Sequence, residues 1–324
     1  MKKILIIGSN SFSGSHMVNY FLKRGYYVIG ISRSSLDKLY LPFNSKDKNF
    51  KFYRLDLNKH NKEVVNVIKK NKPIYILNYA AQGMVNESWF TPLDWYQTNT
   101  ISNIKLVEEI KRFKFIKKFL QFSTPEVYGN TENVIFENEP FNPTTPYAIS
   151  RSACDYHLLK ISKYFKFPVV ITRTANVYGP YQKLYRIVPK TMMMIKKNKK
   201  IVVHGKGLSS RSFIHIDDVC NATNKVLKKG RIGHSYHIST NSYITIKDLV
   251  KKINKLMNVK NMYSFSDDRI GKDHRYHLSS NKLKNETKWS SKIKIEKGLA
   301  DTLDWINSNY KYLKKEKLIY EHKK

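Results

Sequence analysis

The sequence predicts an α/β protein with a doubly wound parallel sheet and a smaller mixed region in its C-terminal half. Two observations predict it. Through the first 180 residues, short β-branched runs alternate with helical stretches, and these runs are apolar on both faces, as strands covered on both sides must be. A loop with two glycines also follows the first run and opens the first helix. In such sheets a ligand binds in the crevice at the carboxyl ends of the strands.

The elements of this first part follow one another as strand and helix in turn. Strands are expected at the short apolar runs, and helices where apolar residues recur every three or four positions. The expected strands are 3–7, 26–31, 51–55, 74–78, 117–122 and 169–173. The expected helices are 14–24, 60–70, 92–111 and 146–165.

After Gly179 and Pro180 the alternation loosens. Loops rich in Arg, His and Asp separate the elements there, and the tail 311–324, mostly Lys, Glu and Tyr, is expected to be a frayed helix end. We therefore divide the chain into residues 1–180 and a smaller region, 181–324, that partly returns to the sheet. Its expected strands are 201–204 and 235–239, and its expected helices are 185–196, 217–228 and 246–257.

The composition excludes several classes of protein. Apolar residues make up 41% of the 324, which is enough to bury a core and excludes a disordered chain. Lys and Arg number 59 against 25 Asp and Glu, a net charge of +34. The lysines are scattered along the chain, which favours a solvated surface that attracts anionic ligands over a specific nucleic-acid site.

Two cysteines, Cys154 and Cys220, cannot form a disulfide scaffold, and their spacing matches no metal motif. A reducing, cytoplasmic compartment follows from that usage. The apolar run at the start stops at Gly8, which is too short for a signal peptide, and no run has the length of a membrane span.

The loop Gly8-Ser-Asn-Ser-Phe-Ser-Gly14 has the composition of a dinucleotide-binding turn. Backbone N–H groups must approach a pyrophosphate there, so small residues are required. Gly8 and Gly14 meet that need, and Ser11, followed by Phe12, replaces the third glycine of the usual pattern. Residues 1–180 are thus expected to form a Rossmann domain that binds a nicotinamide dinucleotide.

The end of the second strand bears on the choice of dinucleotide. An NAD site usually has an acid there for the ribose hydroxyls, but this chain has Arg33 between serines, which favours NADP over NAD. Asp56 is expected near the adenine, and the small residues Ala80 and Ala81, with Gln82, near the nicotinamide ribose.

Three further segments combine chemistry with position: STPEVYG at 123–129, YAISR at 147–151 and NVYGPY at 176–181. The first two follow the fifth strand and open the long helix, so both face the crevice. With RSFIHIDD at 211–218 and DRIGKDHRY at 268–276, they make the whole chain resemble the extended short-chain dehydrogenase/reductases of the epimerase/dehydratase type. Within these it is most similar to the dTDP-glucose 4,6-dehydratases.

The resemblance implies that Tyr147 transfers the proton of the substrate's O4, with Thr124 as its hydroxyl partner. The family has lysine four residues after the tyrosine, whereas this chain has Arg151. An arginine keeps the charge that lowers the tyrosine pKa, but it cannot lose its own proton.

Glu126 matches the glutamate that removes the C5 proton in dehydratases. The carboxylate can do so only after C4 is oxidised, because the C5 hydrogen is not acidic before then. Those enzymes also have an aspartate as the acid for the departing C6 hydroxyl, where this chain has Pro125, so a water or the protonated Glu126 remain as alternatives.

The substrate is expected to be a nucleoside diphosphate sugar. Asn176, Arg211 and Arg275 match positions that bind the diphosphate, Arg186 replaces a family lysine, and His204 begins a loop beside the base. His215, inside an apolar run, is expected to be structural.

The resemblance thus predicts a 4,6-dehydratase that oxidises C4, eliminates water and returns the hydride to C6, with tightly bound NADP or NAD, no metal and no membrane span. It also predicts a homodimer. The alternatives are a UDP-glucuronate decarboxylase, a 4-epimerase of nucleotide sugars, and a non-catalytic, RNA-binding member of the same fold.

Overall fold

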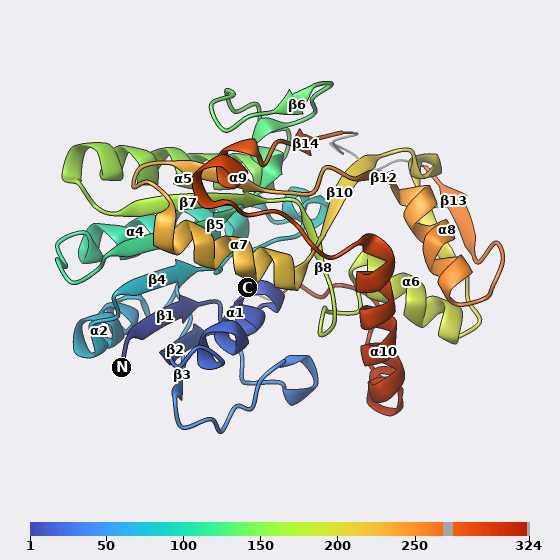
Figure 1. Cartoon of the computed structure of the whole chain (residues 1–324), viewed down its shortest axis with the longest axis horizontal. Coiled ribbons are helices and arrows are strands. Elements are labelled where there is room, and N and C mark those ends of the chain that lie inside the picture. Colours follow the sequence, from blue (N-terminus) through green and yellow to red (C-terminus); the bar gives the residue numbers. More distant parts are fainter. Residues whose placement is uncertain (268–274, 323–324) are drawn as a thin grey trace.

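A seven-stranded sheet, parallel throughout, forms the centre of the computed structural model, which describes residues 1–267 and 275–322 (Figure 1). The strand order, β11-β7-β5-β4-β1-β2-β3, reverses direction beside β1, so the expected doubly wound sheet is confirmed. Its strands are β1 (Lys3–Ile7), β2 (Tyr27–Ser32), β3 (Phe50–Arg54), β4 (Tyr75–Asn78), β5 (Lys118–Ser123), β7 (Val169–Thr174) and β11 (Ser235–Ile238).

Helices cover both faces of this sheet, because its strands are apolar on both sides. Ile4 and Ile6 of β1 pack against one layer, and Leu5 and Ile7 pack against the other. The first layer contains α1 (Phe12–Leu22), α7 (Ile216–Lys229) and α9 (Asn281–Thr287). The second contains α2 (Asn61–Asn71), α4 (Ser102–Ile110) and α5 (Pro146–Phe165).

The remaining elements pack beside the carboxyl ends of the large sheet. The helices α6 (Ile187–Lys196), α8 (Ile246–Leu256) and α10 (Ile295–Leu313) share a third core (Figure 1). Strand β11 and helices α7 and α9 follow residue 180 but belong to the large sheet and its layer. The division at residue 180 stays a prediction. The small sheets join β8 (Asn176–Tyr178), β10 (Ser210–His215) and β12 (Tyr243–Thr245); β9 (Ile201–His204) and β13 (Tyr263–Ser266); and β6 (Val134–Ile135) and β14 (His277–Leu278).

Several elements differ from expectation; helix α9 and the strands of the small sheets other than β9 were not expected. The helix expected at 92–111 is interrupted: α3 (Pro92–Tyr96) passes through a π-helical turn, η3 (Gln97–Ile101), into α4. Helix α10 was not expected. The tail is not a frayed helix end beyond Leu313, because residues 314–322 leave α10 and their side chains contact other elements. No helix among the described residues is long and apolar enough to cross a membrane.

Candidate active site

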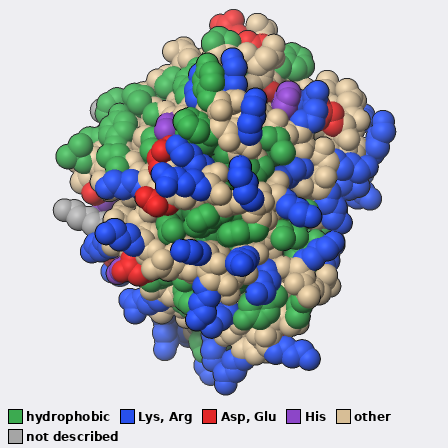
Figure 2. Space-filling view, turned by 90° about the vertical axis from the view of Figure 1, so that its left-hand side faces the viewer, with side chains coloured by type: hydrophobic (Ala, Val, Ile, Leu, Met, Phe, Trp, Pro, Cys, Tyr) green, Lys and Arg blue, Asp and Glu red, His purple; other side chains and the backbone are tan. Residues whose placement is uncertain are grey.

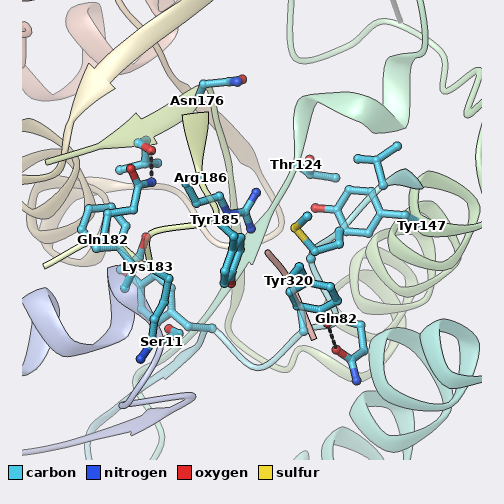
Figure 3. A pocket seen from close by; sticks show the side chains of 18 of the residues that line it. Ser11, Gln82, Thr124, Tyr147, Asn176, Gln182, Lys183, Tyr185, Arg186 and Tyr320 are labelled. Carbon is cyan, nitrogen blue, oxygen red and sulfur yellow. Dashed lines mark hydrogen bonds between the residues drawn. The ribbon is translucent and has the colours of Figure 1, made fainter. Parts of the chain in front are cut away.

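A cavity of about 850 Å³ lies at the carboxyl ends of β1, β2, β4 and β5, facing the second part of the chain (Figure 3). The volume is typical of a site for a cofactor or small ligand. It is lined by nearly all the residues that the sequence nominated: Gly8, Ser11, Phe12, Arg33, Asp56, Ala80, Ala81, Gln82, Thr124, Glu126, Tyr147, Arg151, Asn176, Arg186, His204 and Arg211.

The phosphate loop turns sharply between β1 and α1. Gly8 has a φ of +81°, and a Cβ there would lie 2.8 Å from the backbone of Tyr79. A Cβ on Gly14 would lie 2.1 Å from the Gly8 oxygen, so that glycine permits close packing behind the loop. Ser11, the departure from the glycine pattern, caps α1 by accepting a hydrogen bond from the Gly14 N–H at 3.1 Å. This cap starts the helix at Phe12 rather than at residue 14.

Beside this loop, Arg33 is half-buried at the carboxyl end of β2 and lines the cavity. Asn10 fixes this turn, because its side-chain amide donates to the backbone oxygens of Ser34 and Ser35 at 2.8 and 3.0 Å. The Asn10 N–H also donates to the Ser32 hydroxyl at 3.0 Å. The turn therefore places an arginine among serine hydroxyls.

The segment after β4 is held by a buried amide. Asn99 accepts from the Gln82 N–H at 2.8 Å and donates to the Gln82 backbone oxygen at 3.1 Å, while its amide also bonds Ser150. Asn99 lies in the π-helical turn between α3 and α4. This turn therefore positions the amide that holds Gln82 in the cavity wall.

The three catalytic candidates come together at the end of β5 and the start of α5. The Thr124 hydroxyl donates to the Glu126 carboxylate, and Tyr147 lies beside them (Figure 3). Burial raises the pKa of Tyr147, the Glu126 carboxylate adds to that rise, and Arg151 opposes it. Without a bound ligand, Tyr147 therefore holds its proton more tightly than a free tyrosine.

Arg151 is 2% exposed and directs its guanidinium between the sheet and the cavity. Its Nη2 donates to the Phe122 backbone oxygen, while Nε and Nη1 have no hydrogen-bond partner among the described residues. Buried donors without partners are costly, so these two nitrogens point to a ligand that accepts from them.

The substrate end of the cavity holds Asn176, Arg186, His204 and Arg211. Arg275 is an exposed residue that does not line it; its Nε donates to His277 Nδ1 at 3.2 Å. Residues 268–274 of the DRIGKDHRY motif lie outside the described residues.

Tyr276, next to Arg275, is a site residue that the sequence reasoning missed. Its hydroxyl lies 3.2 Å from Glu126 Oε1 and 3.0 Å from Asn176 Oδ1 and can donate its one proton to either, and the Arg211 guanidinium lies 4.2 Å from its ring centroid. It therefore links Glu126, the candidate base, to Asn176, a candidate substrate residue. The sequence signal for Tyr276 was its position as the last residue of the DRIGKDHRY motif. Tyr320, from the tail, also lines the cavity and had no such signal.

Two other expectations concern residues outside the cavity. His215 is buried and caps α7, with its Nδ1 accepting from the Asp217 N–H at 3.3 Å, so its structural role is confirmed. Cys154 and Cys220 are free and buried. Within residues 1–267 and 275–322, no cluster of His, Cys, Asp and Glu is placed to hold a metal ion.

Comparisons with known proteins agree on one family. The model of the GDP-mannose 4,6 dehydratase family matches residues 5–302. The dTDP-D-glucose 4,6-dehydratase of Bos taurus is 31% identical over 95% of this chain and 90% of its own length. A trifunctional enzyme of Arabidopsis thaliana, with UDP-glucose 4,6-dehydratase activity, is 33% identical over 95% of this chain and 47% of its own.

A solved structure gives the same result. The dTDP-glucose 4,6-dehydratase of Bacillus anthracis, in complex with NAD, superposes with a TM-score of 0.88 and 31% identity, over 96% of this chain and 98% of that one. The expected resemblance to nucleotide-sugar 4,6-dehydratases is confirmed, including its nicotinamide dinucleotide. Since the family model spans most of the chain and the relatives cover nearly all of it, this chain belongs to the GDP-mannose 4,6 dehydratase family and is an enzyme.

Proposed function

We propose that this enzyme removes water from a nucleoside diphosphate hexose to give the 4-keto-6-deoxy sugar, with Glu126 as the base at C5. The observation that carries the proposal is the position of Glu126. Its carboxylate lies in the cavity beside Thr124 and Tyr147, bonded to the Thr124 and Tyr276 hydroxyls. Hydroxyl donors on both sides orient the carboxylate toward a sugar bound next to Tyr147.

The residues present fit a nicotinamide dinucleotide. Gly8 and Ser11 provide a loop open to a pyrophosphate, and the unpaired Nε and Nη1 of Arg151 match the two hydroxyls of a ribose. When bound, the cofactor supplies the oxidation of the sugar at C4 and the later reduction at C6. Arg151 would hold the ribose while its charge eases the loss of the Tyr147 proton.

To act as a base, Tyr147 must be the phenolate, which the charge of Arg151 would stabilise once the ligands are bound. In that form, with Thr124 beside it, it accepts the proton of the sugar's O4 hydroxyl. Glu126 then takes the C5 proton, which the C4 ketone has made acidic. Pro125 has no proton to give, so the acid for the C6 hydroxyl must come from elsewhere. We assign it to Glu126, which carries the C5 proton at that moment and gives it to the leaving oxygen, so that water departs. Glu126 then regains a proton from solvent and delivers it to C5 as C6 is reduced.

The charged side chains at the other end of the cavity fit the diphosphate. Arg186 and Arg211 both line it, and arginine forks match phosphate oxygens in geometry. Asn176 and His204 complete the substrate residues that we propose. Arg275 is not placed to contact a ligand in this cavity, so we assign it to fixing the segment before Tyr276 through His277 and Asn130.

We also propose that NADP binds in preference to NAD, although the Bacillus anthracis relative was solved with NAD. Arg33 lines the cavity between Ser32 and Ser34. A second arginine lies close by, because Arg54 Nε donates to the backbone oxygen of Arg33 at 3.3 Å. Two positive charges there would attract a 2′-phosphate.

Further proposals concern assembly and location. Helices α3 and α5 pack together, and their outer sides carry exposed apolar residues, which supports a homodimer through this face. The free, buried thiols of Cys154 and Cys220 suit the reducing cytoplasm that we propose as the enzyme's location.

Mass spectrometry after incubation with a panel of nucleoside diphosphate hexoses tests the proposed reaction. We expect a product lighter by one water. In Glu126→Gln the elimination should fall by roughly 10²–10⁴-fold, because the shape remains but the base is lost. Absorbance of reduced cofactor should still develop in this variant, whereas Tyr147→Phe should show none.

The matched control is Glu132→Gln, which changes an exposed glutamate of the same stretch. It should retain the wild-type rate. In heavy water the product should carry deuterium at C5. Dehydration by Glu126→Gln at the wild-type rate, or the absence of any dehydrated product from the panel, would contradict the assignment.

A further inference from the structure

The nine residues after α10, 314–322, form a strap that crosses from one part of the molecule to the other. It begins at the end of α10. Early in the strap, Glu316 accepts a hydrogen bond from the Tyr40 hydroxyl at 3.3 Å, and Leu318 packs against the core around α10. The far end reaches α3, which packs on the large-sheet side.

His322 fixes that far end to α3. Its ring stacks on Trp95 with centroids 4.8 Å apart and an interplanar angle of 17°. Its Nε2 also lies 2.7 Å from the Asp94 carboxylate. A stacked ring with a directed hydrogen bond defines one position rather than a loose contact, so His322 acts as a latch for the strap.

Tyr320 is the part of the strap that reaches the cavity. Its ring meets Tyr185 edge to face at 5.3 Å, and its hydroxyl donates to Gln82 Oε1 at 3.4 Å (Figure 3). Gln82 belongs to the segment nominated for the nicotinamide ribose, and Tyr185 adjoins the substrate residue Arg186. Burial raises the pKa of Tyr320, so the hydroxyl stays protonated near neutral pH and can donate to a ligand.

Tyr320 is the residue of the strap that lines the cavity, and it does not fill it. With Tyr320 in place, the cavity still measures about 850 Å³ and extends from the phosphate loop to Tyr147. That volume is within the usual range for a cofactor site. A dinucleotide and the strap can therefore be present together.

We propose that the strap closes over the bound dinucleotide, with Tyr320 contacting it and the His322 latch holding it closed. The inference rests on the proposed function, because that reaction uses the same cofactor molecule twice and fails if the cofactor leaves between the two uses. The strap retains it during that interval.

The strap is built to open as well as to close. Residues 314–322 contain no helix or strand, and the Ile319 side chain is 64% exposed. A segment held by a few side-chain contacts opens at much lower free energy than the core. Opening at the end of the reaction would let the cofactor exchange.

Cofactor dissociation from the full-length enzyme tests the proposal. Stripped protein is titrated with NAD and with NADP, and the release of reduced cofactor is followed by its fluorescence, without any substrate. Tyr320→Ala and His322→Ala should each release it about three- to tenfold faster, as expected for the loss of one aromatic contact or of the latch. Tyr312→Ala, an exposed tyrosine of α10, is the matched control and should behave as wild type.

The outcomes separate this proposal from the proposed function. If both variants release the cofactor at the rate of the control, the strap does not retain the cofactor and the proposal is wrong. Tighter cofactor binding in the variants would also contradict it, because the tail would then compete with the cofactor. Failure of the wild-type enzyme to bind either dinucleotide would instead contradict the proposed function. Thermal unfolding should show unchanged midpoints for all three variants, because the substituted side chains lie at the surface or in the strap.

Discussion

Arg33 is the side chain on which the proposed preference for NADP rests. The residues around it are serines, and the turn that carries it is fixed by Asn10 rather than by the arginine itself. The Arg33 guanidinium is not needed to fix this turn, so it can bind a phosphate. An acid at the same place would repel the 2′-phosphate and bind the ribose hydroxyls instead.

We therefore expect Arg33→Ala to weaken NADP binding about tenfold or more, since a hydrogen-bonded charge pair is lost. NAD binding should change little. Titration of the cofactor-free protein with both dinucleotides gives the two affinities, and Arg112→Ala, an exposed arginine outside the cavity, is the control. Tighter binding of NAD that is unchanged in Arg33→Ala would refute the preference for NADP.

The residues that the sequence could predict share one property: each follows a strand or opens a helix within a short motif. Thr124, Glu126 and Tyr147 are of this kind, and the structure brings them together. Tyr276 was missed although it lies in a quoted motif, because only its tertiary contacts with Glu126 and Asn176 reveal its role. Arg275 was nominated from the same motif, yet its side chain turns to His277.

At the scale of the element, periodicity predicted the strands of the large sheet and most of its covering helices to within a few residues, but not α9 or the interruption before α4. Local pattern decides those elements because their apolar sides repeat with the period of a strand or a helix. The strap shows no such periodicity. The hydrogen bonds of Tyr320 and His322 go to Gln82 and Asp94, more than 200 positions earlier in the chain. Its path depends on nonlocal contacts, so the sequence alone predicted a frayed helix end.

The paired helices α3 and α5 support a prediction about assembly. Leu93 is 78% exposed on α3, and Ile149 is 42% exposed on α5, which is unfavourable in a monomer. We expect the double variant Leu93→Glu, Ile149→Glu to shift a dimer to a monomer, because two charges per copy would be buried unpaired. Light scattering after gel filtration measures the mass. Ile232→Glu changes an exposed residue outside α3 and α5, so this control variant should stay dimeric. If the wild-type protein is a monomer at micromolar concentration, the proposed dimer is wrong.

At the scale of the whole molecule, the +34 charge is spread rather than gathered. Figure 2 shows Lys and Arg side chains over the centre, the right and the lower part of the face that it presents, with few acids, while apolar side chains gather at its upper left. A field of this kind raises the local concentration of anions around the cavity and speeds the encounter with a nucleoside diphosphate sugar. A charge spread in this way favours contacts with phosphates over contacts with base edges.

The same field predicts weak RNA binding without sequence preference. Each phosphate contact releases a counterion, so the affinity should fall steeply as salt rises, in parallel for RNAs of different sequence. Filter binding across a salt series measures this. Lys228→Ala, an exposed residue remote from the cavity, should lower the affinity only slightly, and a nucleoside diphosphate sugar should displace little of the RNA because the contacts are spread over the surface. Strong preference for one RNA at physiological salt, abolished by Lys228→Ala, would instead mean that a specific RNA site lies outside the catalytic cavity.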